Sequence, residues 1–307
     1  MIINFTFLTS KIILLCLLVV IGYVLGKWRP LDAKTIASLL LYVISPIMIF
    51  QGMTLSTLSA GFFLLPLLFF TLASIVGWST LQVAKRYWTD GTANLLAFTA
   101  GTANTGYFGF PIVLALFGDE GLAVAILSMA GFTLYEVTLG FYFTARGSHS
   151  LRESIRRVVR LPFLYAIIAG ILLNQWAPPF IKETVLLLDP FKGAYTVLGM
   201  MMIGLSLSSV KLGDWDGWFI ASCFALRFVL WPILLTGIII LDETYYGFFN
   251  PTHQGIIWLV GVVPLAANTV VVATELNVQP QKAALAVMLS TLFSIVYIPA
   301  FFSAVYT

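Results

Sequence analysis

Long apolar stretches separated by short polar segments run along the whole chain. Each stretch is about 20 residues long, which is the length that an α-helix needs to cross the hydrocarbon core of a bilayer. Because these stretches show no polar face, they do not match the amphipathic helices of a water-soluble domain. We therefore predict an all-α membrane protein with ten membrane-spanning helices, at about residues 9–26, 33–54, 60–83, 94–117, 121–145, 161–176, 191–210, 217–241, 254–276 and 282–305.

The composition agrees with this prediction. Of the 307 residues, 60% are hydrophobic and only 9% are charged, and the mean hydropathy is +0.99. A soluble domain would carry about a quarter charged residues, and a transmembrane β-barrel would alternate apolar and polar positions. Residues 1–26 lack a signal-peptide cleavage site, so we expect them to form the first crossing. Cys16 and Cys223 lie in apolar runs and predict neither a disulfide nor a metal site.

The basic residues gather on one side of the predicted bundle. Twelve lie on that side, namely Lys27, Arg29, Lys34, Lys85, Arg86, Arg146, Arg152, Arg156, Arg157, Arg160, Lys211 and Lys282. Three lie on the other side, namely Lys11, Lys182 and Lys192. Because basic loops stay in the cytoplasm, we predict that both termini lie outside, in a plasma or bacterial inner membrane. The net charge of +3 follows from this distribution and indicates no nucleic-acid partner.

The chain divides into two similar halves. The longest cytoplasmic segment, residues 146–160, carries five arginines and separates residues 1–145 from residues 161–307. Gly22–Pro30 resembles Gly170–Pro178 in its glycine, tryptophan and proline positions. Five predicted helices separate the two copies, and an odd number gives them opposite orientations in the membrane. We therefore predict an inverted repeat of five plus five helices.

The tripeptide Ala-Asn-Thr occurs in the middle of two apolar stretches, at Ala103–Thr105 and at Ala267–Thr269. Residues that break helices flank both copies: Gly106, Gly109 and Pro111 near the first, and Pro264 near the second. In lipid, the freed backbone groups are tolerated only inside protein or at a hydrated cavity. Two broken helices at corresponding places are typical of the binding site of a secondary transporter.

The residues at these breaks suit an anionic substrate. The N-terminus of a half-helix presents free amides and a partial positive charge, which favour a carboxylate. Asn104 and Asn268 add amide groups, while Thr105 and Thr269 add hydroxyls next to Gly106. The alternative is a pair of ordinary proline kinks whose asparagines bond neighbouring helices.

Two ionisable residues lie inside predicted membrane helices, where such residues are functional candidates by default. Glu136 is a candidate proton acceptor or, together with Thr138, a sodium ligand; the alternative is a structural partner of Arg227 or of backbone groups. For Arg227 we favour a structural role, as a clamp under the broken helices. Tyr135 is grouped with these residues as a supporting side chain.

In these residues the chain resembles the auxin efflux carrier family, which includes plant auxin exporters and bacterial carriers of malonate and other organic anions. Leu39–Pro46, Asn104–Pro111 and Arg227–Pro232 resemble segments of its second, fourth and eighth helices. Pro264 and Asn268 stand where the plant carriers have a proline-asparagine crossover, but here Ala267 precedes the asparagine. The long cytoplasmic loop of many plant carriers is also absent, which counts against auxin as the substrate.

The resemblance implies a sodium–bile-acid-symporter-like fold, in which helices 4 and 9 are broken and cross. Helices 1, 2, 6 and 7 would form a scaffold, often dimeric, and helices 3–5 and 8–10 a transport unit that moves like an elevator. Substrate would bind near Asn104, with Gln51 and Thr54 of the second helix facing the same pocket. Surrounding lipid and a second copy of the chain are the other implied partners.

The sequence thus predicts a secondary transporter that exports small organic anions such as carboxylates. It predicts no cofactor, and H⁺ or Na⁺ as the coupling ion. A sodium-coupled symporter of steroid-like anions and a non-transporting sensor remain as alternatives. An enzyme is not expected, because the chain has neither a His-Glu-x-x-His nor a Gly-x-Ser-x-Gly motif.

Overall fold

The described part of the chain is helical and contains no strand. The computed structural model describes residues 5–29, 31, 33–56, 63–145, 160, 162–176, 178, 183–208 and 215–305. Six helices there are long and apolar enough to cross a membrane, namely Thr35–Leu55, Leu65–Ala84, Thr92–Thr144, Glu183–Leu205, Gly217–Tyr245 and Pro280–Val305. The predicted all-α membrane protein is confirmed. Of the predicted basic linker only Arg160 falls within the described residues, and Lys182 and Lys211 lie outside them.

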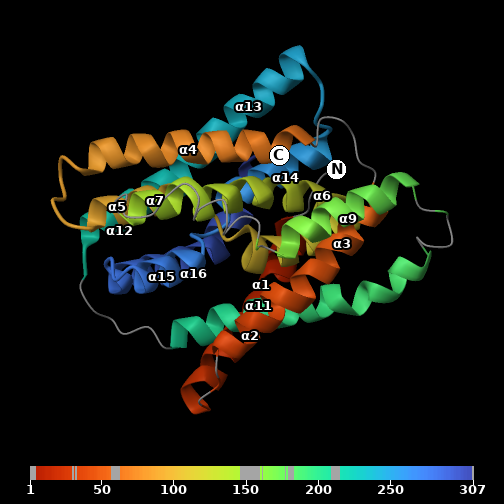
Figure 1. Cartoon of the computed structure of the whole chain (residues 1–307), viewed down its shortest axis with the longest axis horizontal. Coiled ribbons are helices and arrows are strands. Elements are labelled where there is room, and N and C mark those ends of the chain that lie inside the picture. The colour runs from red at the N-terminus through yellow and green to blue at the C-terminus, as the bar shows by residue number, and fades with distance from the viewer. Residues whose placement is uncertain are drawn as a thin grey trace.

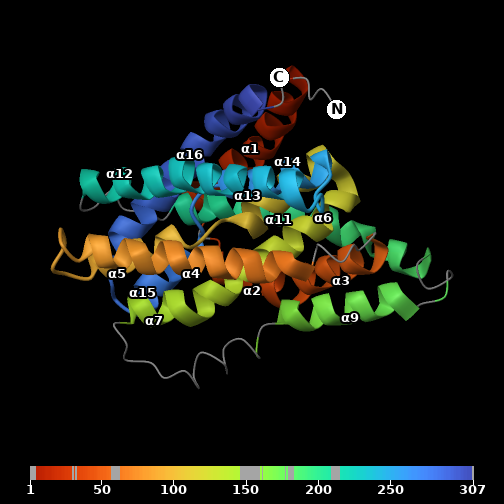
Figure 2. The same ribbon diagram turned by 90° about the horizontal axis from the view of Figure 1, so that it is seen from above.

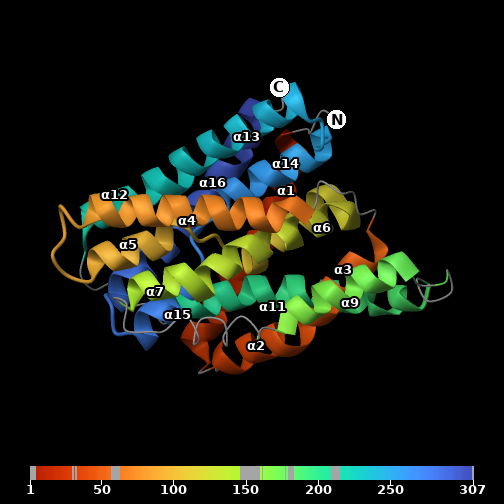
Figure 3. The same ribbon diagram turned by 45° about the horizontal axis from the view of Figure 1, so that its top comes forward.

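The first group of helices is built around α11. It consists of α1 (Phe5–Trp28), α2 (Ala33–Leu39), α3 (Ser45–Leu55), α9 (Pro162–Trp176) and α11 (Asp189–Ser208). α1 packs along α11. α3 lies beside α9 (Figures 1 and 3). A Cβ atom on Gly204 would lie 1.9 Å from the carbonyl oxygen of Val19. Glycine therefore lets the backbones of α1 and α11 approach closely, as small residues do in many membrane helix pairs.

The second group contains the other helices. They are α4 (Leu65–Ala84), α5 (Thr92–Ala100), α6 (Phe110–Tyr135), α7 (Phe141–Thr144), α12 (Gly217–Ala225), α13 (Trp231–Tyr245), α14 (Pro251–Val262), α15 (Asn268–Glu275) and α16 (Pro280–Val305). The two groups meet where α1 packs on α6 and α16 and where α3 packs on α6. His253, expected in a loop, lies in α14, because Asn250 caps that helix by accepting the His253 N–H at 2.9 Å.

The helical stretch Thr92–Thr144 folds back on itself at Gly118. A straight helix of these 53 residues would be about 80 Å long, far more than the ~30 Å hydrocarbon core of a bilayer. Gly118 has φ 65° and ψ −157°, a conformation that an L side chain rarely adopts. As a result α5 and α7 contact each other, and both lie at the same end of the molecule (Figure 2).

Three π-helical turns come just before prolines. They are η1 (Leu40–Ile44), η3 (Thr105–Gly109) and η6 (Leu226–Leu230). The prolines are Pro46, Pro111 and Pro232, each four residues after the central residue of its turn. A proline lacks the N–H of the helical ladder and its ring clashes with the carbonyl four residues earlier, so the helix widens at that residue. A fourth π-helical turn, η4 (Glu136–Gly140), has no proline at this distance.

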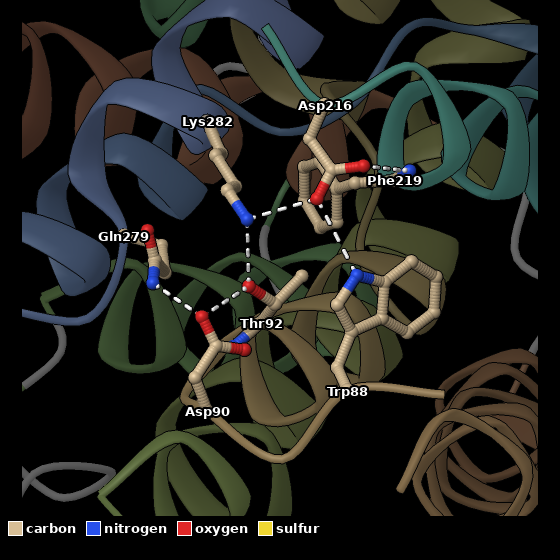
Figure 4. Close-up of polar contacts among 7 residues, drawn as sticks. All are labelled: Trp88, Asp90, Thr92, Asp216, Phe219, Gln279 and Lys282. Atoms are coloured by element: carbon tan, nitrogen blue, oxygen red, sulfur yellow. Dashed lines mark hydrogen bonds and ion pairs between the residues drawn. The ribbon is translucent and has the colours of Figure 1, made fainter. Parts of the chain in front are cut away.

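A polar cluster joins the α4–α5 turn to the first turns of α12 and α16 (Figure 4). Lys282 Nζ lies 2.8 Å from Asp216 Oδ2 and donates to Thr92 Oγ1 at 3.0 Å. Asp216 also caps α12 by accepting the Phe219 N–H at 3.0 Å. Partial burial alone would raise the pKa of Asp216, but the hydrogen bonds from Lys282 and Phe219 and the charge of Lys282 outweigh it and hold this pKa below its usual value. The cluster therefore joins three segments that lie far apart in the chain around one ionised carboxylate.

Candidate substrate-binding site

Two broken helices meet inside the second group. The first ends as α5 at Ala100 and resumes at Thr105 in η3, and the second ends as α14 at Val262 and resumes as α15 at Asn268. We call the two breaks with the residues that follow them, 101–105 and 263–269, the crossover. The Asn104 N–H donates to the Pro264 carbonyl oxygen at 2.9 Å, which joins the two breaks directly. α5 and α15 lie toward one end of the molecule and α6 and α14 toward the other, so the broken helices run in opposite directions (Figure 2).

Arg227 satisfies backbone carbonyls from both breaks. Its Nε donates to the Val263 carbonyl oxygen at 2.6 Å, and its Nη2 donates to that of Val260. Its Nη1 reaches the Thr102 carbonyl oxygen of the other break at 3.4 Å. The side chain is 1% exposed, and no ion pair joins it to a carboxylate in the part of the chain that the structure describes. Arg227 therefore occupies the clamp position that was hypothesised for it, with a positive charge beside both breaks.

Trp231 is a second clamp, which the sequence reasoning missed. Its Nε1 donates to the Ala100 carbonyl oxygen at 2.7 Å, at the C-terminal end of α5. The guanidinium of Arg227 lies 5.6 Å from the centre of the Trp231 ring. The available signal was the spacing, because Trp231 follows Arg227 by four residues, about one helical turn.

Three buried polar atoms at the crossover have no hydrogen-bond partner: Asn104 Nδ2, Thr105 Oγ1 and Thr269 Oγ1. The three residues are 4%, 0% and 1% exposed. Leaving such a group unsatisfied costs about 1–3 kcal/mol, so unpaired groups gathered at one place call for an explanation. An amide nitrogen donates and a hydroxyl both donates and accepts. These three atoms can therefore hold a ligand that is rich in acceptor oxygens.

The structure brings Glu136 and Asn268 together. Asn268 Nδ2 donates to Glu136 Oε2 at 2.9 Å, and this carboxylate lies in η4, in a residue that is 7% exposed. Asn268 itself is exposed, and Val271, one turn further along α15, is 61% exposed. One face of α15 is therefore open as far as the Glu136–Asn268 pair. A separate cavity of about 420 Å³ lies just after the C-terminal end of α15, lined by Asn277 and Thr144 among others.

Tyr135 and Thr138 direct their hydroxyls elsewhere. Tyr135 Oη donates to the Ala97 carbonyl oxygen at 2.7 Å, and Thr138 Oγ1 donates to the Leu134 carbonyl oxygen of its own helix. A Cβ atom on Gly101 would lie 2.3 Å from Tyr135 Cε1. The Tyr135 ring therefore packs against the first residue of the first break and supports it from behind.

α11 packs against η3, the segment that follows the first break. A Cβ atom on Gly106 would lie 3.0 Å from Tyr195 Oη, and the Tyr107 and Tyr195 rings are stacked with centroids 6.2 Å apart. Nearer the start of α11, Lys192 Nζ lies 2.6 Å from Asp119 Oδ1, just after the Gly118 reversal. These contacts close one side of the crossover. The helix-breaking Gly109 and Pro111 lie in the same segment, at the end of η3 and the start of α6.

Gln51 and Thr54 form their hydrogen bonds inside the first group. Gln51 Nε2 donates to Asp189 Oδ1 at 2.7 Å and to the Val185 carbonyl oxygen at 3.2 Å. Thr54 Oγ1 donates to the Phe50 carbonyl oxygen at 2.8 Å. The structure gives neither side chain a bond to the crossover, although Gln51 Oε1 is buried without a partner. Their contact with substrate stays a prediction.

Residues 7–157 match the family described as membrane transport protein. The match includes the first break and Glu136. The chain is also similar to an uncharacterized transporter of Methanothermobacter thermautotrophicus, with 27% identity over 300 residues that cover 95% of this chain and 96% of the relative. An uncharacterized transporter of Methanocaldococcus jannaschii is 27% identical over 304 residues, which cover 94% of this chain and 95% of that protein.

Proposed function

We propose that this chain, which matches the membrane transport protein family over residues 7–157, is a secondary transporter of small organic anions. The matched family, to which the auxin efflux carriers belong, is the one predicted from the sequence, and together with the two transporter-named relatives it supports a membrane transporter. The observation that carries the choice of substrate class is the set of three buried, unpartnered polar atoms at the crossover. A carboxylate supplies the acceptor oxygens that these groups lack.

Electrostatics at the crossover support an anion. The Arg227 guanidinium bonds carbonyls of both breaks and forms no ion pair in the described residues. Its charge raises the potential at the crossover, and in a low-dielectric interior this attraction acts over several ångströms. The N-terminus of α6 through η3 adds the partial positive charge of a helix start. A small carboxylate at Asn104 and Thr105 would receive donors from side chains and an attractive field from Arg227.

The mechanism we infer is elevator-like alternating access. In this account the chain crosses the membrane ten times as an inverted repeat, the first group is a scaffold that forms a homodimer, and the second group carries the crossover. The opposite directions of the two broken helices support the inverted repeat (Figure 2). The open face of α15 and the closed contact of η3 with α11 describe one end state, and movement of the second group along α11 would produce the other.

Uptake by proteoliposomes tests this function. Radiolabelled malonate, succinate, indole-3-acetate and taurocholate are offered under a proton gradient, a sodium gradient or neither. The account predicts saturable uptake of a small carboxylate that requires Asn104. Sodium-dependent uptake of taurocholate would instead identify a steroid-anion symporter, and binding without flux would identify a sensor. Neither of these outcomes is compatible with the proposed function.

Glu136 is expected to couple transport to an ion gradient. Because its carboxylate accepts from Asn268 at the crossover, its protonation or cation binding would alter the substrate site directly. In E136Q, gradient-driven uptake is expected to fall by about 5- to 150-fold, the factor that corresponds to a typical coupling free energy. Exchange of substrate without a gradient is expected to persist. E243Q is the matched control, because Glu243 accepts from Gln254 at 3.0 Å away from the crossover. Unchanged ion dependence in E136Q would remove the coupling role.

The Lys192–Asp119 ion pair is expected to slow movement between the two groups. It joins α11 of the first group to the α6 segment of the second, so it must break when the second group moves. Because Asp119 is 56% exposed, the pair contributes at most about 1 kcal/mol, and D119N should speed turnover by no more than about fivefold. D189N is the control, because Asp189 is equally exposed and pairs with the same lysine inside α11. Equal rates in the two variants would contradict the proposed movement.

A further inference from the structure

We propose that the groove between α4 and the α12–α13 helix is a binding site for one anionic glycerophospholipid of the surrounding bilayer. The groove has a volume of about 990 Å³ and runs along α4 from Leu72 to the turn at Trp88. Its other wall extends from Trp218 to Leu234. Both walls belong to the second group, and no residue of the crossover lines the groove.

The dimensions of the groove suit an acyl chain. Leu72 to Ala84 covers about 18 Å of α4, slightly more than the ~15 Å of one leaflet's hydrocarbon layer. Eight of its 17 lining residues are isoleucine, valine or leucine, and Ile75 and Val83 are 56% and 54% exposed. Small residues such as Ser79 leave the space open. An apolar chain therefore fills this groove at little cost in lost hydrogen bonds.

Hydroxyl groups within the groove indicate a ligand that carries some polar atoms. Ser79, Thr80 and Ser222 line it, and their hydroxyls form no hydrogen bond in the described structure. Other hydroxyls in these helices bond their own backbone, as Ser74 Oγ does to the Phe70 carbonyl oxygen at 2.6 Å. Hydroxyls that are free in an apolar groove can donate to the ester oxygens of a glycerophospholipid.

The mouth of the groove has the composition of a headgroup site. Tyr87 and Trp218 are 75% and 81% exposed there, and such aromatic residues mark the level of the membrane interface. Lys85 and Arg86, which stand between the lining residues Ala84 and Tyr87 in the chain, are exposed and form no ion pair in the described part of the chain. The nearby Asp216 is already matched by Lys282 (Figure 4). The mouth is therefore left with unmatched positive charge, which favours an anionic headgroup.

Native mass spectrometry of the full chain in a neutral detergent tests the proposal, with phosphatidylglycerol and phosphatidylcholine as probes. One phosphatidylglycerol is expected to bind more tightly than phosphatidylcholine. Replacing both cations in K85Q/R86Q should weaken phosphatidylglycerol binding by about thirtyfold and leave phosphatidylcholine unchanged. S79F, at an exposed position inside the groove, should weaken both lipids by occupying the space of the acyl chain.

K27Q/R29Q is the matched control, because these cations are also exposed but lie at the end of α1 in the first group. It should leave both affinities unchanged. Equal affinity for the two lipids, or the same loss in K27Q/R29Q as in K85Q/R86Q, would overturn the proposal. Loss of a dimer rather than of lipid in S79F would also overturn it, by assigning the groove to a second copy of the chain.

Discussion

N104A is expected to weaken carboxylate binding by about 10- to 100-fold, because a hydrogen bond to a charged group contributes about 1.5–3 kcal/mol. In the unmodified protein the Nδ2 atom of Asn104 is buried and has no hydrogen-bond partner, so the amide is available to a ligand. N268A should lose affinity as well and also release Glu136. Binding is measured by equilibrium dialysis with the anion that proteoliposomes take up. N94A is the control, because the Asn94 amide already donates to the Phe143 carbonyl oxygen at 2.7 Å.

T105V separates binding from folding at the same site. The Thr105 hydroxyl is fully buried and unpartnered, and valine has nearly the same shape without it. Removing an unsatisfied buried hydroxyl should stabilise the empty protein by about 1 kcal/mol or more while it weakens binding. A variant that loses both stability and affinity would show instead that the hydroxyl serves the fold. Unaltered affinity in both N104A and T105V would remove the crossover as the binding site.

R227M is expected to destabilise the protein more than any substitution at the crossover asparagines. It leaves the carbonyls of Val260, Val263 and Thr102 without their donor in a dry interior. At about 1–3 kcal/mol for each unsatisfied group, the loss is about 3 kcal/mol or more, which corresponds to about 6–12 °C in thermal unfolding. R227K keeps the positive charge but lacks the planar, forked set of N–H donors of a guanidinium group. It should therefore recover less than half of the stability that R227M loses. R29M, at an exposed arginine just after α1, is the control.

An unfolding temperature of R227M within about 2 °C of the unmodified protein would contradict the clamp. It would mean that the two breaks hold their shape through the Asn104–Pro264 bond and Trp231 alone. Full recovery in R227K would show that positive charge at the crossover matters more than the hydrogen-bond geometry. Arg227 would then still attract an anionic substrate by its charge, but it would not act as a hydrogen-bonding clamp on the two breaks.

The breaks could be predicted from the sequence because their causes are local. Proline and glycine interrupt a helix within one turn of where they stand, so Pro111 and Pro264 mark the crossover to within a few residues. The π-helical turns follow the same rule, and a search for the residue four before each proline would have found three of them. The placement of Arg227 under the breaks was also predictable, since a buried arginine must find acceptors.

The partners of these residues could not be predicted, because they come from segments far apart in the chain. Trp231 reaches across 131 positions to Ala100, and Lys192 reaches across 73 to Asp119. No local pattern specifies such pairs. Gln51 was assigned to the substrate pocket by resemblance alone, and its bond to Asp189 of α11 could not be read from the sequence. The unpaired state of Asn104 Nδ2 and Thr105 Oγ1 likewise emerges only from packing.

Protection of a cysteine at position 271 by substrate tests the central claim most directly. Val271 lies on the open face of α15, one turn from Asn268, and the native Cys16 and Cys223 are only 6% and 1% exposed. The rate at which a water-soluble maleimide modifies V271C is measured with and without the anion that proteoliposomes take up. The account predicts slower modification with the anion, and no protection when N104A is added. Equal rates in the presence of a transported anion would place the binding site away from the crossover.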